Sequence, residues 1–180
     1  MASAELEARV NVQPTSQLAR EQHELRRLVA QSATFQARVD QAGNPALAAK
    51  RIYLGGNWLD GVDVDGHALA RPYAIVMRPP GPLWALAAGG DKNYLRRRGN
   101  LWLYLADNSR FPNDPDDDQT DFCNFVGGVD EDMAALAGYD TWLPIASIEL
   151  VGTPQHSPIE LGDPGSKWWQ AWYGLEWGLS

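Results

Sequence analysis

The sequence predicts a single α+β domain, in which a mostly antiparallel sheet of four strands, or slightly more, carries two main helices in the order α-β-β-α-β-β. Two apolar patterns of helical period alternate with stretches of strand character along the 180 residues. The strands are not linked by the regular helical crossovers of βαβ units, which favours antiparallel pairing. The length and the hydrophobic content of 44% are typical of one globular domain with a full core.

The chain divides into an N-terminal arm, residues 1–14, and one domain, residues 15–180. The arm holds few large apolar residues and ends at Pro14, so we expect it to lie outside the core. It also lacks the basic and apolar regions of a secretory signal, which predicts a protein made in the cytoplasm. No apolar run approaches the roughly 20 residues that span a bilayer, so we expect a soluble protein without a membrane partner.

The first helix is expected to begin with Thr15 or Ser16 as N-cap and to continue until it stops near Gly43. Asn44 followed by Pro45 has the chemistry of an N-cap and first helical position, which predicts a short second helix. The apolar residues of the first helix fall on one stripe, and the arginines lie largely elsewhere. This stripe comprises Leu18, Leu25, Leu28, Val29, Phe35 and Val39.

Strand character is strongest at residues 73–77, where the sequence YAIVM is apolar at every position and predicts a central strand. Residues 52–54 suggest a short strand, and the glycine- and aspartate-rich residues 55–70 that follow predict an exposed loop. The remaining strands are expected at residues 94–106, 143–151 and 168–177.

A second amphipathic helix is expected after an acidic loop, with Asp118 or Thr120 as its cap. Gly127 and Gly128 weaken this helix by roughly 1 kcal/mol each relative to alanine, which predicts close backbone packing there. Cys123 is expected to pack in or near the core. The buried stripe of this helix comprises Phe122, Phe125, Val126, Val129, Met133 and Leu136.

The chain carries none of the common signatures of catalysis or nucleotide binding. The motifs GxSxG, GxxxxGK[ST] and GxGxxG are absent, and the three histidines lie far apart without an HExxH pattern. The single cysteine excludes an intramolecular disulfide. We therefore predict no enzymatic activity, no catalytic residue, no cofactor and no metal.

Two acidic segments are candidates for a cation site, because hard cations prefer several carboxylate oxygens. The segment at residues 60–66, DGVDVDG, resembles an EF-hand loop, but the matching register makes Gly61 the first ligand and Pro72 the twelfth, which excludes it. The second segment is better explained as a solvated loop that caps a helix, although a metal-dependent hydrolase remains an alternative. Its aspartates are Asp114, Asp116, Asp117, Asp118 and Asp121.

The charge distribution predicts contacts between subunits rather than binding of nucleic acid. A net charge of -8 disfavours neutralisation of phosphates, so DNA that passes nearby would not be bound. Basic residues at one place and aspartates at another could pair across a head-to-tail interface. Eight tryptophans are also compatible with either a partner surface or a tryptophan-rich core. The candidates for an interface or a lumen are Arg96, Arg97, Arg98, Asp114, Asp116, Asp117, Asp118, Trp168 and Trp172.

Four stretches in this order resemble one family. They are LRRLVAQSATFQARV in the first helix, the strand entered by ARPYAIVM, the segment DFCNFVGGVDEDMAAL, and LPIASIELVG followed by KWWQAWYGLEWG. Together they cover roughly residues 16–178 and resemble the tail terminator, or tail completion, proteins of long-tailed, lambda-like phages.

The resemblance implies a small α/β fold that assembles as a ring, usually a hexamer, at the head-proximal end of the tail. Such a ring terminates the tail tube, contacts the tube protein and the head-side neck or connector protein, and lets DNA pass through its lumen. The implied location is therefore the virion. Another neck, head-closure or minor virion protein is the first alternative; a monomeric module that binds sugar or peptide through aromatic strands is a remoter one.

Overall fold

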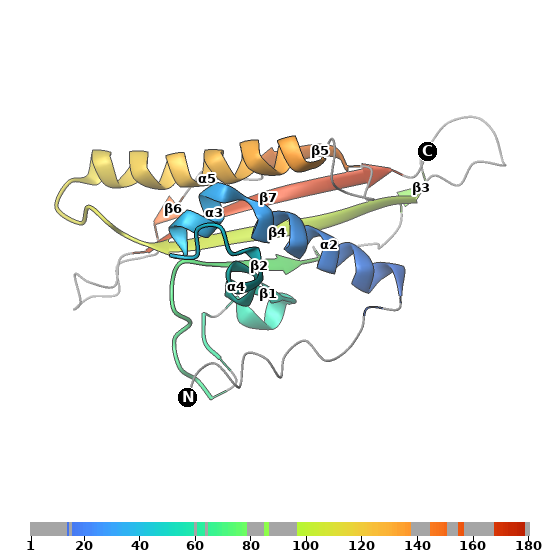
Figure 1. The fold of residues 1–180 in the computed structure, drawn as a ribbon, viewed down its shortest axis with the longest axis horizontal. Helices are drawn as coiled ribbons and strands as arrows, with labels where there is room; N and C mark the ends of the chain where they lie inside the picture. Colours follow the sequence, from blue (N-terminus) through green and yellow to red (C-terminus); the bar gives the residue numbers. More distant parts are fainter. Residues whose placement is uncertain are drawn as a thin grey trace.

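The computed structural model describes residues 14, 16–59, 61–63, 65–78, 85–86, 97–137, 145–150, 155–156 and 168–178 (Figure 1). In residues 17–18, 85–86, 97–100, 137 and all described strands beyond 137, the description is of the backbone alone, so the predicted burial of Leu18 lies outside it. The predicted arm therefore lies outside the described residues, apart from Pro14.

The helices and strands alternate along the chain in an α+β pattern, so the predicted class is confirmed. The α-helices are α2 (Gln17–Gln31), α3 (Ala33–Arg38), α4 (Pro45–Ala48) and α5 (Pro115–Ala137), and two 3-10 turns are η2 (Ala49–Arg51) and η3 (Gly56–Trp58). The strands are β1 (Ile52–Leu54), β2 (Tyr73–Met77), β3 (Ala85–Leu86), β4 (Arg97–Asn108), β5 (Ile145–Leu150), β6 (Gln155–His156) and β7 (Trp168–Gly178). No helix in the described part of the chain has the length and apolar character of a membrane span.

The sheet is mixed, with the strand order β1-β2-β4-β7-β5, while β3 pairs with β4 and β6 pairs with β7. β1 runs parallel to β2, with Ile52 opposite Ala74. The other pairings are antiparallel. The parallel pair was not predicted from the sequence, because no long helix separates its two strands. A crossover needs only about a dozen residues or more, and residues 55–72 provide that length without a long helix.

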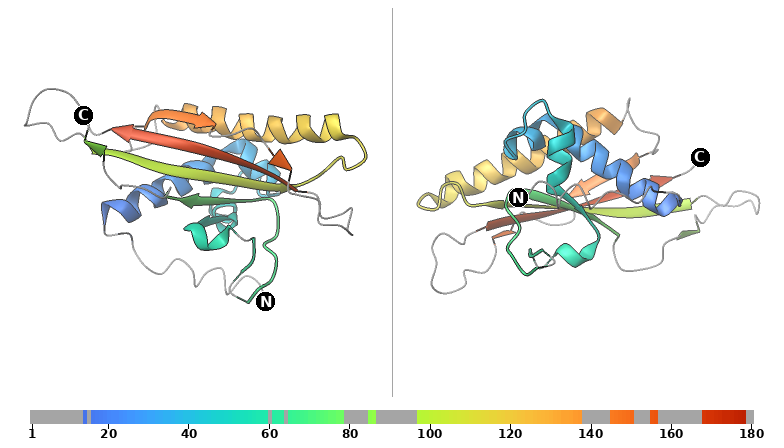
Figure 2. Two further views of the ribbon diagram at one scale, coloured as in Figure 1. Left: turned by 180° about the vertical axis from the view of Figure 1, so that it is seen from behind. Right: turned by 60° about the horizontal axis from the view of Figure 1, so that its bottom comes forward.

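The two faces of the sheet carry different apolar clusters, because alternate residues of β2 and β4 point to opposite sides. The larger cluster joins Val76, Leu103 and their neighbours to the helices, and includes Leu25 of α2, Phe35 of α3 and Phe122 of α5. The smaller cluster on the other face contains Leu69, Tyr73, Ile75, Tyr104 and Ala106, with Trp58 of η3 packed against it. Accordingly, α5 and η3 lie on opposite sides of the sheet (Figure 2).

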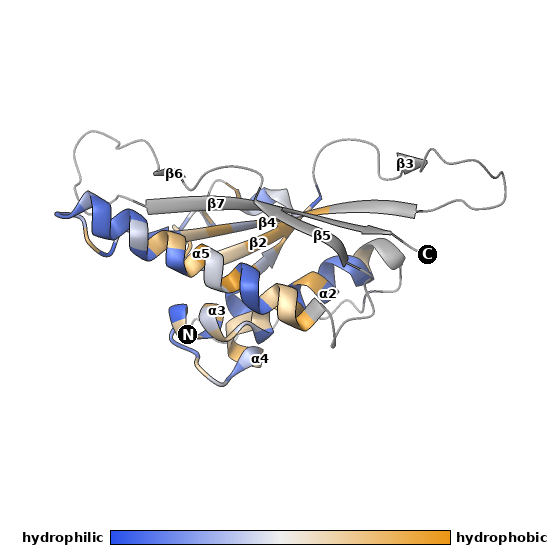
Figure 3. Ribbon diagram, turned by 90° about the horizontal axis from the view of Figure 1, so that it is seen from above, coloured by the Kyte–Doolittle hydropathy of each residue, from blue (hydrophilic) through white to orange (hydrophobic). Residues whose placement is uncertain are grey.

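The buried stripes of the helices were largely predicted correctly. Leu25, Leu28, Val29, Phe35 and Val39 are all buried. The same is true of the α5 stripe as far as Met133, although Leu136 is only half-buried. Apolar and hydrophilic residues alternate along α2 and α5 in Figure 3, as expected for helices with one buried face.

The expectation of one long first helix was wrong, because the chain breaks at Ser32 into α2 and α3. Ser32 has ψ 122° and caps α3, accepting a hydrogen bond from the Phe35 N–H at 3.0 Å. Its hydroxyl donates to Asp132 of α5 at 2.7 Å, and the Thr34 N–H donates to the same carboxylate oxygen at 2.9 Å. A residue that is distant in sequence therefore stabilises the start of α3, which the apolar stripe could not reveal.

Close packing of α3 against α5 explains one of the two glycines of α5. A Cβ added at Gly128 would lie 2.8 Å from Thr34 Cγ2 and 2.9 Å from Thr34 Oγ1, too close for any real contact. A Cβ added at Gly127 would meet nothing within 4 Å. The prediction of close backbone packing is thus confirmed for Gly128 and wrong for Gly127.

Candidate functional site

Arg38, at the end of α3, is the centre of a group of charges that comes from three separate elements. Its Nε donates to Asp107, near the end of β4. Its two terminal nitrogens donate to Asp121 of α5, with Nη1 to Oδ1 at 3.0 Å and Nη2 to Oδ2 in a shorter contact. The guanidinium carbon also lies 5.0 Å from the centre of the Phe125 ring, a cation-π distance. One arginine thereby joins a helix, a strand and a second helix.

Burial and charge act in opposite directions on this group. Burial disfavours the charge of Arg38, but its hydrogen bonds to Asp121 and Asp107 and their negative charges outweigh this and raise its pKa. Burial raises the pKa of Asp107, although Arg38 partly offsets that effect. Asp107 is 2% exposed, so removal of its arginine partner would leave a carboxylate with poor solvation. The cluster is therefore a structural clamp with a high cost of disruption.

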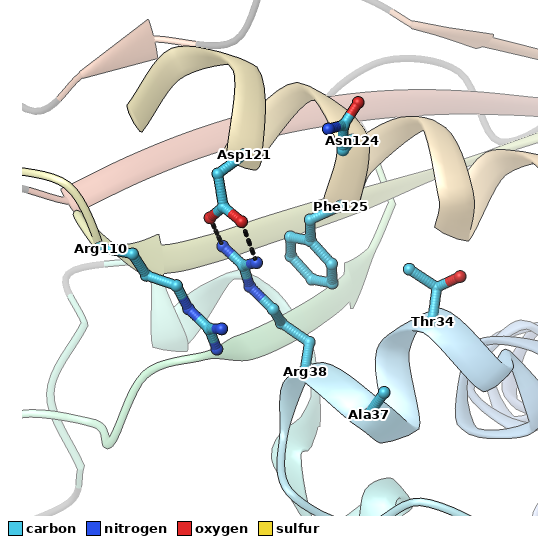
Figure 4. A pocket seen from close by; sticks show the side chains of 7 residues that line it. All are labelled: Thr34, Ala37, Arg38, Arg110, Asp121, Asn124 and Phe125. Carbon is cyan, nitrogen blue, oxygen red and sulfur yellow. Dashed lines mark hydrogen bonds and ion pairs between the residues drawn. The ribbon is translucent and has the colours of Figure 1, made fainter. Parts of the chain in front are cut away.

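Beside the clamp lies a shallow hollow of about 300 Å³ (Figure 4). Asp121 and Arg38 lie against each other on its wall, joined by their hydrogen bonds, and the Phe125 ring lies next to the Arg38 side chain. Its wall comes from α3, α5 and the turn between β4 and α5. The lining residues are Thr34, Ala37, Arg38, Arg110, Asp121, Asn124 and Phe125.

The predicted aspartate group is divided by the fold into different tasks. Asp114, rather than Asp118 or Thr120, caps α5: the Asp117 N–H donates to Asp114 Oδ1 at 3.3 Å, and Pro115 occupies the first helical position. The expected cap was therefore wrong. The Asp114-Pro115 pair carries the same signal as Asn44-Pro45, and could have been recognised from the sequence.

Asp118 is 2% exposed and holds the turn between β4 and α5. It accepts hydrogen bonds from the Ser109 hydroxyl at 2.7 Å and from the backbone N–H groups of Arg110 and Phe111, both at 2.8 Å. These donors explain how a carboxylate can be buried there. Among the predicted lumen candidates, Asp114, Asp116 and Asp117 are exposed, whereas Asp118 is enclosed by its own turn.

The predicted basic and aromatic residues are placed by their backbones. Arg97 and Arg98 begin β4, and Arg96 lies outside the described residues. Arg98 and Asn108 are ten positions apart along β4, about 33 Å at about 3.3 Å per residue, and α5 begins seven residues after Asn108. Trp168 and Trp172 belong to β7, where they pair with Asn108 and Tyr104 of β4.

A second acidic group lies in the turn before β2. Carboxylate oxygens of Asp63 and Asp65 and a ring nitrogen of His67 lie within 4.8 Å of one another, the geometry of a possible cation site. Asp63 Oδ1 also accepts the N–H groups of Asp65 and His67, both at 2.9 Å. The His67 bond is the largest cause of the lowered pKa of Asp63. The turn itself thus accounts for this arrangement.

Two further features differ from expectation or were not expected. Cys123 is exposed, so its predicted place in or near the core was wrong. It follows Phe122 by one residue, a rotation of about 100° around a helix of 3.6 residues per turn, which turns it away from the buried stripe. On the other sheet face, burial raises the pKa of the Tyr73 and Tyr104 phenols, whose ring centres are 6.2 Å apart. These phenols therefore stay protonated.

No protein-family model matches the sequence, and no curated protein matches it either. Sequence reasoning missed the Arg38 clamp, because its two carboxylates are 69 and 83 residues away along the chain. The arginine at the edge of the hollow, Arg110, was also missed and carries no local signal.

Proposed function

We propose that this chain is a structural virion protein that forms a ring at the head-proximal end of a phage tail. The ring terminates polymerisation of the tail tube and joins the tail to the neck. The four stretches that resemble tail terminators support this proposal, and a fold that combines helices with one sheet is compatible with the small α/β fold that the resemblance implies. We also propose that the complete fold is a mostly antiparallel sheet that carries two main helices, in the order α-β-β-α-β-β.

One observation carries the proposal beyond the resemblance: the buried carboxylates hold elements of the fold together. Glu21 of α2, 1% exposed, binds Arg78 after β2 at 2.6 Å. Asp107 binds Arg38, and Asp118 binds the turn at residues 109–111. A catalytic or metal site requires charged groups that face a ligand. Charges that stabilise the scaffold are instead what a subunit acting through contact surfaces requires.

The proposed partners are other copies of the chain, in a ring of about six, the tail-tube protein and a head-side connector protein. The chain has basic residues at the start of β4 and exposed aspartates at the start of α5, and their separation supports a head-to-tail contact. DNA passes through the lumen without specific binding. Exposed carboxylates on the lumen wall would repel phosphates and let the DNA slide.

The solution mass of the purified protein, combined with negative-stain images over a range of concentrations, tests the proposal. The measurement is made with and without the cognate tail-tube protein. Rings of about six subunits, or rings that form only on tubes, are the expected result. A protein that remains monomeric and never binds tubes would refute the proposal and favour a monomeric binding module.

Two alternatives have their own discriminating measurements. A head-closure or other neck protein would also form rings, but these would bind the connector and not the tube. A metal-dependent hydrolase that uses Asp114–Asp121 would show a tight Mg²⁺ or Ca²⁺ site by calorimetry. The role of Asp118 as acceptor for the turn weighs against the hydrolase, because its carboxylate oxygens already have protein donors.

The lumen assignment is tested separately. Replacement of the exposed Asp114, Asp116 and Asp117 by lysine should slow genome ejection from assembled virions, because phosphates would bind the wall. Lysines at Asp40, Asp63 and Asp65, away from the start of α5, provide a control with the same change of charge. Equal ejection rates in both variants and the wild type would remove the three aspartates from the lumen.

A further inference from the structure

We propose that the hollow edged by Arg110 is a contact between subunits and receives a carboxylate from a second copy of this chain. The inference rests on the proposed function, since it names a surface through which the ring would assemble. It is carried by three features of the described residues: a rigid turn, an arginine with available donors, and an aromatic wall.

The turn that carries Arg110 is held in place before any partner arrives. The Asp118 carboxylate accepts hydrogen bonds from the backbone N–H groups of Arg110 and Phe111 and from the Ser109 hydroxyl. A buried carboxylate with three donors restrains the backbone of this turn. A preorganised contact residue loses less conformational entropy on binding than a mobile one. The turn therefore suits presentation of a side chain to a partner.

Arg110 has donors to offer, unlike the other arginine of the hollow. Arg38 is 10% exposed and already bound by Asp107 and Asp121. Arg110 is 45% exposed, and its only ion pair to a described residue is a long one, 3.8 Å from Nε to Asp107 Oδ2. Its side chain makes no hydrogen bond to the described residues. The planar guanidinium can thus bind an incoming carboxylate through two parallel hydrogen bonds.

The surroundings of Arg110 fit a protein side chain better than a free ion. Phe125 and Ala37 supply an apolar wall, and Asn124 adds an exposed amide at the rim. Phe111, next to Arg110, is 46% exposed and adds apolar surface to the same turn. Arginine and aromatic residues are enriched where protein surfaces meet. The hollow therefore has both the polar and the apolar part of a contact.

Charge selects a second copy as the occupant. The chain has 23 acidic and 15 basic residues, so every copy carries a net charge of -8 and copies repel one another at long range. An assembly of such copies requires local sites where a positive group of one meets a carboxylate of the next. Arg110 is an exposed cation that no hydrogen bond within the described fold employs, and each neighbour has abundant exposed carboxylates. The two surfaces are complementary in charge.

Charge reversal at Arg110, with a matched control, tests this inference. Arg110→Glu and Arg20→Glu change the net charge equally, and Arg20 is an exposed residue of α2 outside the hollow. Sedimentation velocity over a range of concentrations should show that Arg110→Glu raises the concentration for half-assembly at least tenfold, while Arg20→Glu assembles nearly as the wild type does. Asn124→Asp, which places a negative charge on the rim of the same hollow, should weaken assembly in the same direction.

The possible outcomes separate this inference from the proposed function. If the wild type forms rings and both Arg110→Glu and Asn124→Asp assemble as Arg20→Glu does, the hollow is not the contact, and the proposed function stands. If the wild type forms no rings, with or without tubes, both proposals fail. Thermal unfolding of each variant confirms that weaker assembly does not reflect an unfolded subunit.

Discussion

The packing of α3 against α5 makes opposite predictions for two adjacent glycines. Gly127→Ala should stabilise the protein by about 1 kcal/mol, because alanine favours the helix by that amount and its Cβ would enter open space. Gly128→Ala has the same helix gain, but its Cβ would collide with Thr34, and overpacking costs about 1–3 kcal/mol. The difference between the two variants isolates the collision.

Thermal and urea unfolding of both variants measure this difference. For a chain of this size, 1 kcal/mol shifts Tm by about 2–4 °C, so Gly127→Ala should unfold several degrees above Gly128→Ala. Thr34→Ala removes the two nearest atoms of Thr34, so the double variant Gly128→Ala with Thr34→Ala should recover part of the loss. Thr34→Ala alone completes the cycle and accounts for the lost hydroxyl. If Gly128→Ala is as stable as Gly127→Ala, the close approach of α3 and α5 is refuted.

Three further predictions concern the buried charges. Arg38→Met should lower the free energy of unfolding by about 3–5 kcal/mol near neutral pH in urea unfolding, because Asp107 loses its partner. Since the pKa of Asp107 is raised, the folded variant binds a proton more readily than the unfolded chain, so this loss of stability should shrink as pH falls. An equal loss at every pH would contradict this reasoning. Asp118→Ala should lower the free energy of unfolding by about 2 kcal/mol, because two backbone N–H groups lose their acceptor. Amide hydrogen exchange at Arg110 and Phe111 should become faster, and unchanged exchange would show that Asp118 does not hold the turn. For Asp132, burial acts to raise the pKa, but hydrogen bonds from Thr34 and Ser32 outweigh it and lower the pKa. The stabilisation by the ionised Asp132 is therefore present above about pH 4 and is lost as pH falls further. In thermal unfolding, Asp132→Asn should therefore lose less stability on acidification than the wild type does.

Local patterns in the sequence were sufficient for much of the fold. Ser16 and Asn44 cap α2 and α4, as the sequence predicts, because each side chain accepts an N–H group only three residues ahead. Residues 73–77 form a strand between two others and are buried up to Val76, which the continuous apolar run predicted. These features depend on neighbours in sequence and on burial.

Features that depend on contacts between residues far apart along the chain could not be predicted from the sequence. The break at Ser32 depends on Asp132, and the need for a residue without a Cβ at Gly128 depends on Thr34, each pair separated by more than 90 residues. The parallel pairing of β1 with β2 depends on how residues 55–72 return across the sheet edge. In each case the local sequence permits more than one arrangement, and the packing of distant elements selects one.

The same distinction applies to the candidate site. The sequence by itself determined the α+β class, the buried stripes and the acidic balance, because hydrophobic periodicity and composition act locally or through simple sums. Only the tertiary structure decided which aspartate holds a turn, and that Arg38 rather than Arg110 is hydrogen-bonded to carboxylates. Those assignments depend on distances between atoms of separate elements, and a desolvated charge is stabilised by whichever donor or counter-charge the fold places beside it.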